Sequence, residues 1–147
     1  MTTAFPDDVA IAGIAAGVLA GTLPKAEWTH AAHFAAALWL LRHQPGFDGA
    51  RDMPGIIRAY NLTTNTPNTD TAGYHHSITL ASLRAAAAAL SVTEAPLHAI
   101  LDTLLAGPCG QRDWLLAHWR RETLFSPAAR LGWVAPDLAP LPYSQNY

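Results

Sequence analysis

Apolar residues at helical spacing, separated by glycine and proline, constrain the fold of this chain more than any other feature. In the segment 26–43, for example, Phe34, Leu38 and Leu41 mark one face of a helix. No run of alternating β-branched residues, which would indicate strands, occurs in the 147 residues. The sequence therefore predicts one all-α domain over 1–147, a helical bundle of about six helices with an extended, proline-rich C-terminal tail.

Turn and capping signals set the expected helix boundaries. Pro54 lies inside the third expected helix and predicts a kink or a split there, while Ser91 and Glu94 match a capping box that starts the fifth. Glycines recur at positions 13, 17 and 21 of the first helix, which indicates close contact with another backbone. The expected helices cover 8–21, 26–43, 47–61, 74–90, 91–106 and 111–124, and Ser126-Pro127 predicts a short last one over 128–131.

Composition and charge narrow the environment and the partners. Half of the residues are hydrophobic and 14% are charged, which favours a large buried fraction, including an interface in a homo- or hetero-oligomer. A net charge of −2 provides no long-range attraction to nucleic acid or anionic lipid. The apolar run 9–23 follows Asp7 and Asp8 rather than basic residues, and it is shorter than the roughly 20 residues that span a bilayer. It indicates a buried helix. Because Cys109 is the single cysteine, a reducing, cytoplasmic location is expected.

Two histidine clusters are the strongest functional signal. His30 and His33 are three residues apart, so their imidazoles share one face of the second expected helix. His75 and His76 follow a polar loop about forty residues later and open the fourth expected helix. We expect the two clusters to meet inside the bundle and to form one site.

The chemistry of this site has three alternatives. In the first, His30, His33 and His75 are ligands of a divalent transition metal such as zinc, iron, nickel or copper. In the second, the site is metal-free: a histidine acts as a general acid or base, and the carboxylate of Asp70 or Glu27 fixes its tautomer. The third is that the histidines are structural and the chain is a non-catalytic binding or partner subunit. The candidate catalytic residues are His30, His33, His75, His76 and Asp70.

Aromatic and amide side chains near the clusters indicate a small-molecule ligand. The candidate substrate-binding residues are Trp28, Tyr60, Asn61, Tyr74 and Thr79. The C-terminal arginines, such as Arg112 and Arg121, lie beside acidic residues and indicate surface ion pairs rather than an anion site. The expectation is an enzyme acting on a small polar metabolite, by metal-dependent chemistry or by metal-free elimination, isomerisation or hydrolysis.

Three stretches, 23–33, 65–75 and 124–130 together with 133–138, resemble an uncharacterised family of small bacterial helical proteins. The family carries W-T-H-x-x-H and G-Y-H motifs, which correspond here to 28–33 and 73–75. The resemblance covers most of the chain and implies no particular reaction. It also implies an acidic residue and a threonine after the Tyr-His pair, where this chain has His76 and Ser77. Such an exchange indicates altered chemistry, a changed metal preference or a lost activity.

Overall fold

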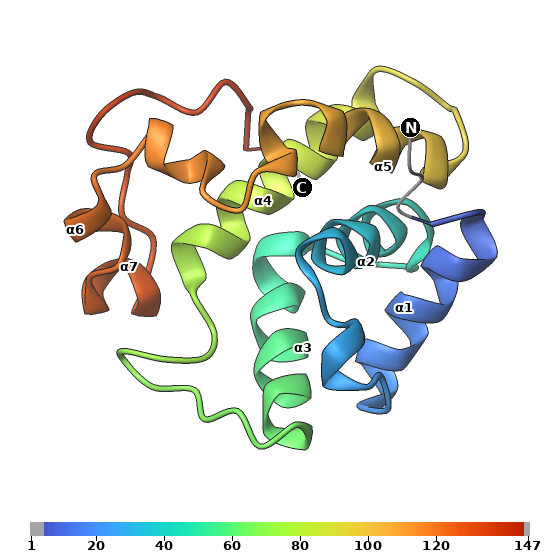
Figure 1. Cartoon of the computed structure of the whole chain (residues 1–147), viewed down its shortest axis with the longest axis horizontal. Helices are drawn as coiled ribbons and strands as arrows, with labels where there is room; N and C mark the ends of the chain where they lie inside the picture. Colours follow the sequence, from blue (N-terminus) through green and yellow to red (C-terminus); the bar gives the residue numbers. More distant parts are fainter. Residues whose placement is uncertain (1–4, 146–147) are drawn as a thin grey trace.

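A computed structural model describes residues 5–145, and over this range the chain is helical with no strand (Figure 1). The all-α prediction is therefore confirmed. Three 3-10 helices, Lys25–Glu27, Pro108–Gly110 and Trp114–Ala117, lie between the α-helices. The α-helices are α1 (Asp8–Ala20), α2 (His30–His43), α3 (Gly49–Thr63), α4 (His76–Ser91), α5 (Leu97–Ala106), α6 (Arg121–Leu124) and α7 (Pro127–Leu131).

Helix α2 lies at the centre of the bundle and packs against α1, α4 and α5, while α3 packs against α1 and α4 (Figure 1). Phe34, Leu38 and Leu40 of α2 are almost completely buried together with Leu83 of α4 and Leu101 of α5. Burial of these side chains supplies the main driving force for folding, at about 25 cal/mol per Å² of apolar surface. The alanines between them have little bulk, so α2 and α4 approach each other closely.

Short polar side chains fix where most helices begin. The side chains of Asp7, Thr29, Asp48, His75 and Ser126 each accept a hydrogen bond from a backbone amide of the first turn of α1, α2, α3, α4 and α7, respectively. The predicted start of the last helix at Ser126-Pro127 is thus confirmed.

The predicted start of α5 at a capping box is wrong. Ser91 belongs to the end of α4, where its hydroxyl donates to the carbonyl of Ala88. Helix α5 begins at Leu97, and its first amides donate to the carboxylate of Asp8 from α1, at 3.0 Å from Leu97 and 2.8 Å from His98. The Asp8 carboxylate also accepts a hydrogen bond from His98 Nδ1 at 2.7 Å. The cap of α5 therefore comes from a distant segment and not from the local Ser91–Glu94 motif. Burial alone would raise the pKa of Asp8, but these hydrogen bonds and the charge of His98 lower it overall.

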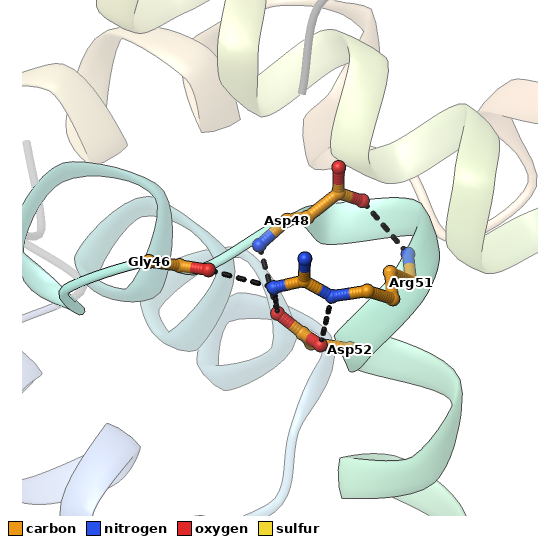
Figure 2. Close-up of polar contacts among 4 residues, drawn as sticks. All are labelled: Gly46, Asp48, Arg51 and Asp52. Atoms are coloured by element: carbon orange, nitrogen blue, oxygen red, sulfur yellow. Dashed lines mark hydrogen bonds and ion pairs between the residues drawn. The ribbon is translucent and has the colours of Figure 1, made fainter.

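A polar network organises the first turn of α3 (Figure 2). Asp48 accepts a hydrogen bond from the backbone amide of Arg51, whose guanidinium donates to Asp52 and to the carbonyl of Gly46. The hydrogen bonds and charge of Arg51 lower the pKa of Asp52 to about 2. Pro54 follows within the same helix, which continues unbroken to Thr63, so the predicted split is not found.

Two further expectations need correction. The predicted helix 111–124 is interrupted: only the 3-10 helix Trp114–Ala117 and the single turn α6 form there. The carbonyl of His118 instead accepts hydrogen bonds from the tail amides of Leu138 and Ala139.

The glycines of α1 differ in their surroundings. Gly17 lies against Leu23 as expected, and a Cβ atom added at Gly17 would be 3.0 Å from the Leu23 Cβ. Gly13 faces open space instead.

The segment after α7 forms the predicted extended tail and returns along α4 (Figure 1). Ser77 of α4 donates to the carbonyl of Gly132 and accepts from the amide of Val134, and the indole of Trp119 donates to the carbonyl of Val134. None of the helices within 5–145 has both the length and the apolar character that crossing a membrane requires.

Candidate functional site

Two adjoining cavities lie between the histidine clusters. The first, of about 360 Å³, is enclosed by the start of α2, the middle of α4, the 3-10 helix Trp114–Ala117 and α6. The second, of about 350 Å³, lies between the start of α2, the end of α3 and the loop 64–75. His33 and Ile78 line both cavities, so His33 lies where the two spaces adjoin.

His33 has one free ring nitrogen. Its Nδ1 lies 2.6 Å from the carbonyl oxygen of Thr29, and because a carbonyl only accepts, Nδ1 carries the proton. The ring stacks on Trp28 with 3.8 Å between the centroids, which fixes its plane. The lone pair therefore lies on Nε2, for which no partner occurs within residues 5–145.

The surroundings of His33 keep it neutral. His33 is exposed to solvent, but many protein atoms lie around its ring. The resulting partial loss of hydration lowers the pKa of His33. The hydrogen bond to Thr29 opposes the shift, and the nearby His30 adds to it. A histidine with its pKa below the ordinary value is unprotonated at neutral pH, as a general base must be.

His30, at the start of α2, is also oriented by a backbone carbonyl. Its Nε2 donates to the carbonyl of Cys109 at 2.7 Å, and its ring lies edge-on to Phe34. The lone pair is then on Nδ1. His30 lines the first cavity only.

His75 has both ring nitrogens engaged. Nδ1 accepts from the amide of Ile78 as the cap of α4, and Nε2 donates to the carbonyl of Leu124 at 2.6 Å. The side chain borders the second cavity but has no lone pair to offer a ligand. Burial lowers its pKa, and the charge of Arg130 lowers it further, which fits a nitrogen that must stay unprotonated to accept from Ile78. The structure therefore places His75 beside His33 in space but gives it a structural hydrogen-bonding role.

His76 does not line either cavity. Its Nδ1 shares a hydrogen bond of 2.8 Å with the hydroxyl of Tyr74, and Arg58 lies over the Tyr74 ring at 4.6 Å. Burial and the charge of Arg58 lower the pKa of His76, and burial raises that of Tyr74 to about 12. The His76 imidazole thus pairs with a tyrosine hydroxyl.

The remaining predicted site residues divide into two groups. Trp28, Asn61, Tyr74 and Thr79 line the second cavity. Tyr60 is buried and donates to the carbonyl of Leu23, so it fixes the turn after α1 instead.

Asp70 is exposed in the loop 64–75 and lines neither cavity. It therefore does not orient an imidazole of the site. The groups that fix the tautomers of His30 and His33 are the backbone carbonyls of Cys109 and Thr29.

Two arginines belong to the site although their spacing indicated surface pairs. Arg112 and Arg121 line the first cavity, and within the described part of the chain neither forms an ion pair. Apolar side chains of Phe34, Trp114 and Leu124 form much of the remaining wall. Arginines spaced nine positions apart in sequence line the same cavity, and the segment between them is not one continuous helix, a break that local periodicity does not indicate.

Among residues 5–145, no group of three or more histidine, cysteine, aspartate or glutamate side chains is arranged to hold a metal ion. The expected set of His30, His33 and His75 does not form one because both nitrogens of His75 are engaged.

Comparison with known proteins finds no family model, no curated protein and no solved structure that matches this chain significantly.

Proposed function

We propose that the chain is an enzyme acting on a small carboxylate-bearing metabolite held in the first cavity, with His33 as a metal-free general base. The observation that carries this proposal is the Nε2 lone pair of His33, whose ring is fixed by Thr29 and Trp28 at the junction of two cavities. In the reaction, Nε2 takes a proton from a substrate carbon or from a water. Elimination, isomerisation and hydrolysis all begin with such a transfer.

The shape and charge of the first cavity support the substrate class. Arg112 and Arg121 supply two cations, and guanidinium groups pair well with carboxylates. Asp113 also lines the cavity and disfavours a polyanion there. The apolar wall fits a ligand with a hydrophobic part, and a volume of about 360 Å³ lies within the range of small-molecule sites.

The second cavity supplies polar groups on the other side of His33. Asn61 donates through Nδ2 to the side chain of Asn68 at 2.9 Å, which leaves its amide oxygen available to a ligand. The base therefore lies between a cavity that carries two arginines and a cavity whose wall includes Lys25 and several amide and hydroxyl groups. Such an arrangement orients an amphipathic substrate across the imidazole.

A substrate screen tests the proposal directly. The purified protein is incubated in D₂O with a panel of small carboxylates, and proton NMR follows deuterium uptake and product formation. His33→Gln should lower the rate about 10²- to 10⁴-fold, as expected for loss of a general base. His43→Gln, at the exposed end of the same helix, is the matched control and should react like the wild type. Equal rates for His33→Gln and the wild type would refute the role of His33.

A second candidate uses the same residues with a metal. His30 and His33 each donate one N–H to a backbone carbonyl, an arrangement that commonly orients metal-bound histidines. Their remaining lone pairs could serve as two ligands, with water or a substrate carboxylate completing the set. Activity that a chelator abolishes and Zn²⁺ or Fe²⁺ restores would favour this version, whereas activity that survives the chelator would favour the metal-free one.

A further inference from the structure

A third cavity, of about 460 Å³, lies between α4 and the C-terminal tail, on residues that neither histidine cavity uses. One side is Arg84 of α4. The tail residues of the other side are mostly apolar and include Trp133, Pro136, Leu138 and Leu141.

Arg84 is a buried cation without a hydrogen-bonding partner among residues 5–145. Its side chain is 8% exposed, and its Nε is buried with no acceptor in the structure. Its guanidinium lies 4.4 Å from the centre of the Trp133 ring, and no hydrogen bond joins it to any residue in the range 5–145. This cation–π contact with Trp133 holds the guanidinium at the wall of the cavity.

The one carboxylate lining this cavity, among residues 5–145, does not neutralise Arg84. Asp137 accepts hydrogen bonds from the backbone amide of Arg120 and from the hydroxyl of Thr123, and it makes no ion pair with Arg84. Both of those hydrogen bonds lower the pKa of Asp137, so it stays ionised. A buried arginine lacking acceptors is unusual, since isolated buried charges are costly and are normally paired.

We propose that this cavity binds a carboxylate through a bidentate pair with Arg84. A guanidinium presents two parallel N–H donors that match the two oxygens of a carboxylate. The apolar tail residues accommodate a short hydrophobic body next to the carboxylate. Asp137 is within the same lining, so a singly charged ligand is favoured over a phosphate of higher charge.

Two sources share this chemistry: a free small carboxylate and the C-terminal carboxylate of a peptide. NMR titrations of ¹⁵N-labelled protein separate them, with isobutyrate as the first probe and a short apolar peptide as the second. The peptide is used with a free and with an amidated C-terminus. The Arg84 Nε–H and the Trp133 indole N–H should shift saturably, and only a peptide site should favour the free-acid peptide over isobutyrate by tenfold or more.

Variants with opposite expected effects make the test specific. Arg84→Met should weaken binding by at least about tenfold, as expected for loss of a charged bidentate pair. Asp137→Asn should strengthen it severalfold by removing a like charge. Arg120→Met removes an exposed cation nearby and should change binding little.

Three results would overturn the proposal: no saturable shift at Arg84 in the wild type, equal affinity in Arg84→Met, or no gain in Asp137→Asn. The wild-type titration and Asp137→Asn decide the question even if Arg84→Met folds poorly. The proposal is independent of His33, and shifts confined to Arg112 and Arg121 would assign the carboxylate to the first cavity instead.

Discussion

His33 and His75 are both near the start of a helix, and desolvation by surrounding protein lowers the pKa of both although His33 is exposed and His75 is buried; yet their roles differ. His75 uses its two nitrogens to connect α4 to α6. His33 uses one nitrogen on its own helix and keeps the other at the meeting point of two cavities.

The difference shows that a lowered histidine pKa does not by itself mark a reactive group. Desolvation acts on both imidazoles, but only the hydrogen-bond partners decide whether a lone pair remains. A histidine with two protein partners stabilises the fold, and one with a single carbonyl partner is available for chemistry. Substitutions at the two kinds of histidine should therefore differ in their effect on stability.

His75→Ala should lower the free energy of unfolding by about 2–4 kcal/mol. About 1 kcal/mol is the cost of losing a helix cap, and about 1–3 kcal/mol follows from leaving the carbonyl of Leu124 without a donor. Urea denaturation measures this loss. His75→Asn, which can still cap α4 but cannot reach Leu124, should recover about 1 kcal/mol of it. A cost below about 0.5 kcal/mol for His75→Ala, the range of ordinary surface substitutions, would contradict its structural role.

Ser77→Ala should cost about 1–3 kcal/mol, because it leaves the carbonyl of Gly132 and the amide of Val134 without partners. Ser77 is fully buried, and its hydroxyl joins α4 to the tail at 2.9 and 3.0 Å. Ser82→Ala on the same helix is the control and should change stability by about 0.5 kcal/mol or less. Equal effects of the two variants would show that the tail contact contributes little to stability.

Most of the fold follows from local signals in the sequence. Helical spacing, Ser126 as a cap and the proline-rich tail are correctly predicted because each depends on nearby residues, although α2 begins at His30 rather than at position 26. The start of α5 and the break before α6 are missed because distant groups decide them: the Asp8 carboxylate and the tail amides that bind His118.

The candidate site is predictable only in part, for the same reason. The spacing of His30 and His33 places them on one helix turn beside the loop 64–75, and the structure brings His33 and His75 to a shared cavity. Spacing does not indicate that the carbonyl of Leu124, forty-nine positions away, engages His75. It also does not indicate that Arg112 and Arg121 line the same cavity.

Acid should destabilise the protein in two separate pH ranges. The pKa values of His33, His75 and His76 are lowered in the fold from 6.5, so the unfolded state binds protons first as pH falls. Stability is therefore fully present above about pH 6.5 and decreases below it. The lowered pKa values of Asp8 and Asp52 add a second loss that begins near 3.8. Urea unfolding at a series of pH values checks this, and a constant stability between pH 7.5 and 5 would contradict the histidine shifts.

His33→Gln should have the smallest effect on stability, about 0.5 kcal/mol or less, because the ring is exposed and connects only to its own helix and to Trp28. The same urea measurement compares it with His75→Ala. A loss as large as that of His75→Ala would mean that His33 is also a structural residue, and the distinction between the two histidines would fail.

Ring-nitrogen NMR of the wild type examines the distinction without any substitution. Long-range ¹H–¹⁵N spectra should show His33 with its proton on Nδ1, and His30 and His75 with theirs on Nε2, because each protonated nitrogen faces a carbonyl oxygen. On addition of a ligand from the first cavity's substrate class, the Nε2 signal of His33 should move while both His75 signals stay in place. Movement of the His75 signals alone would exchange the roles assigned to the two residues, since the ligand would then have displaced the amide of Ile78 or the carbonyl of Leu124.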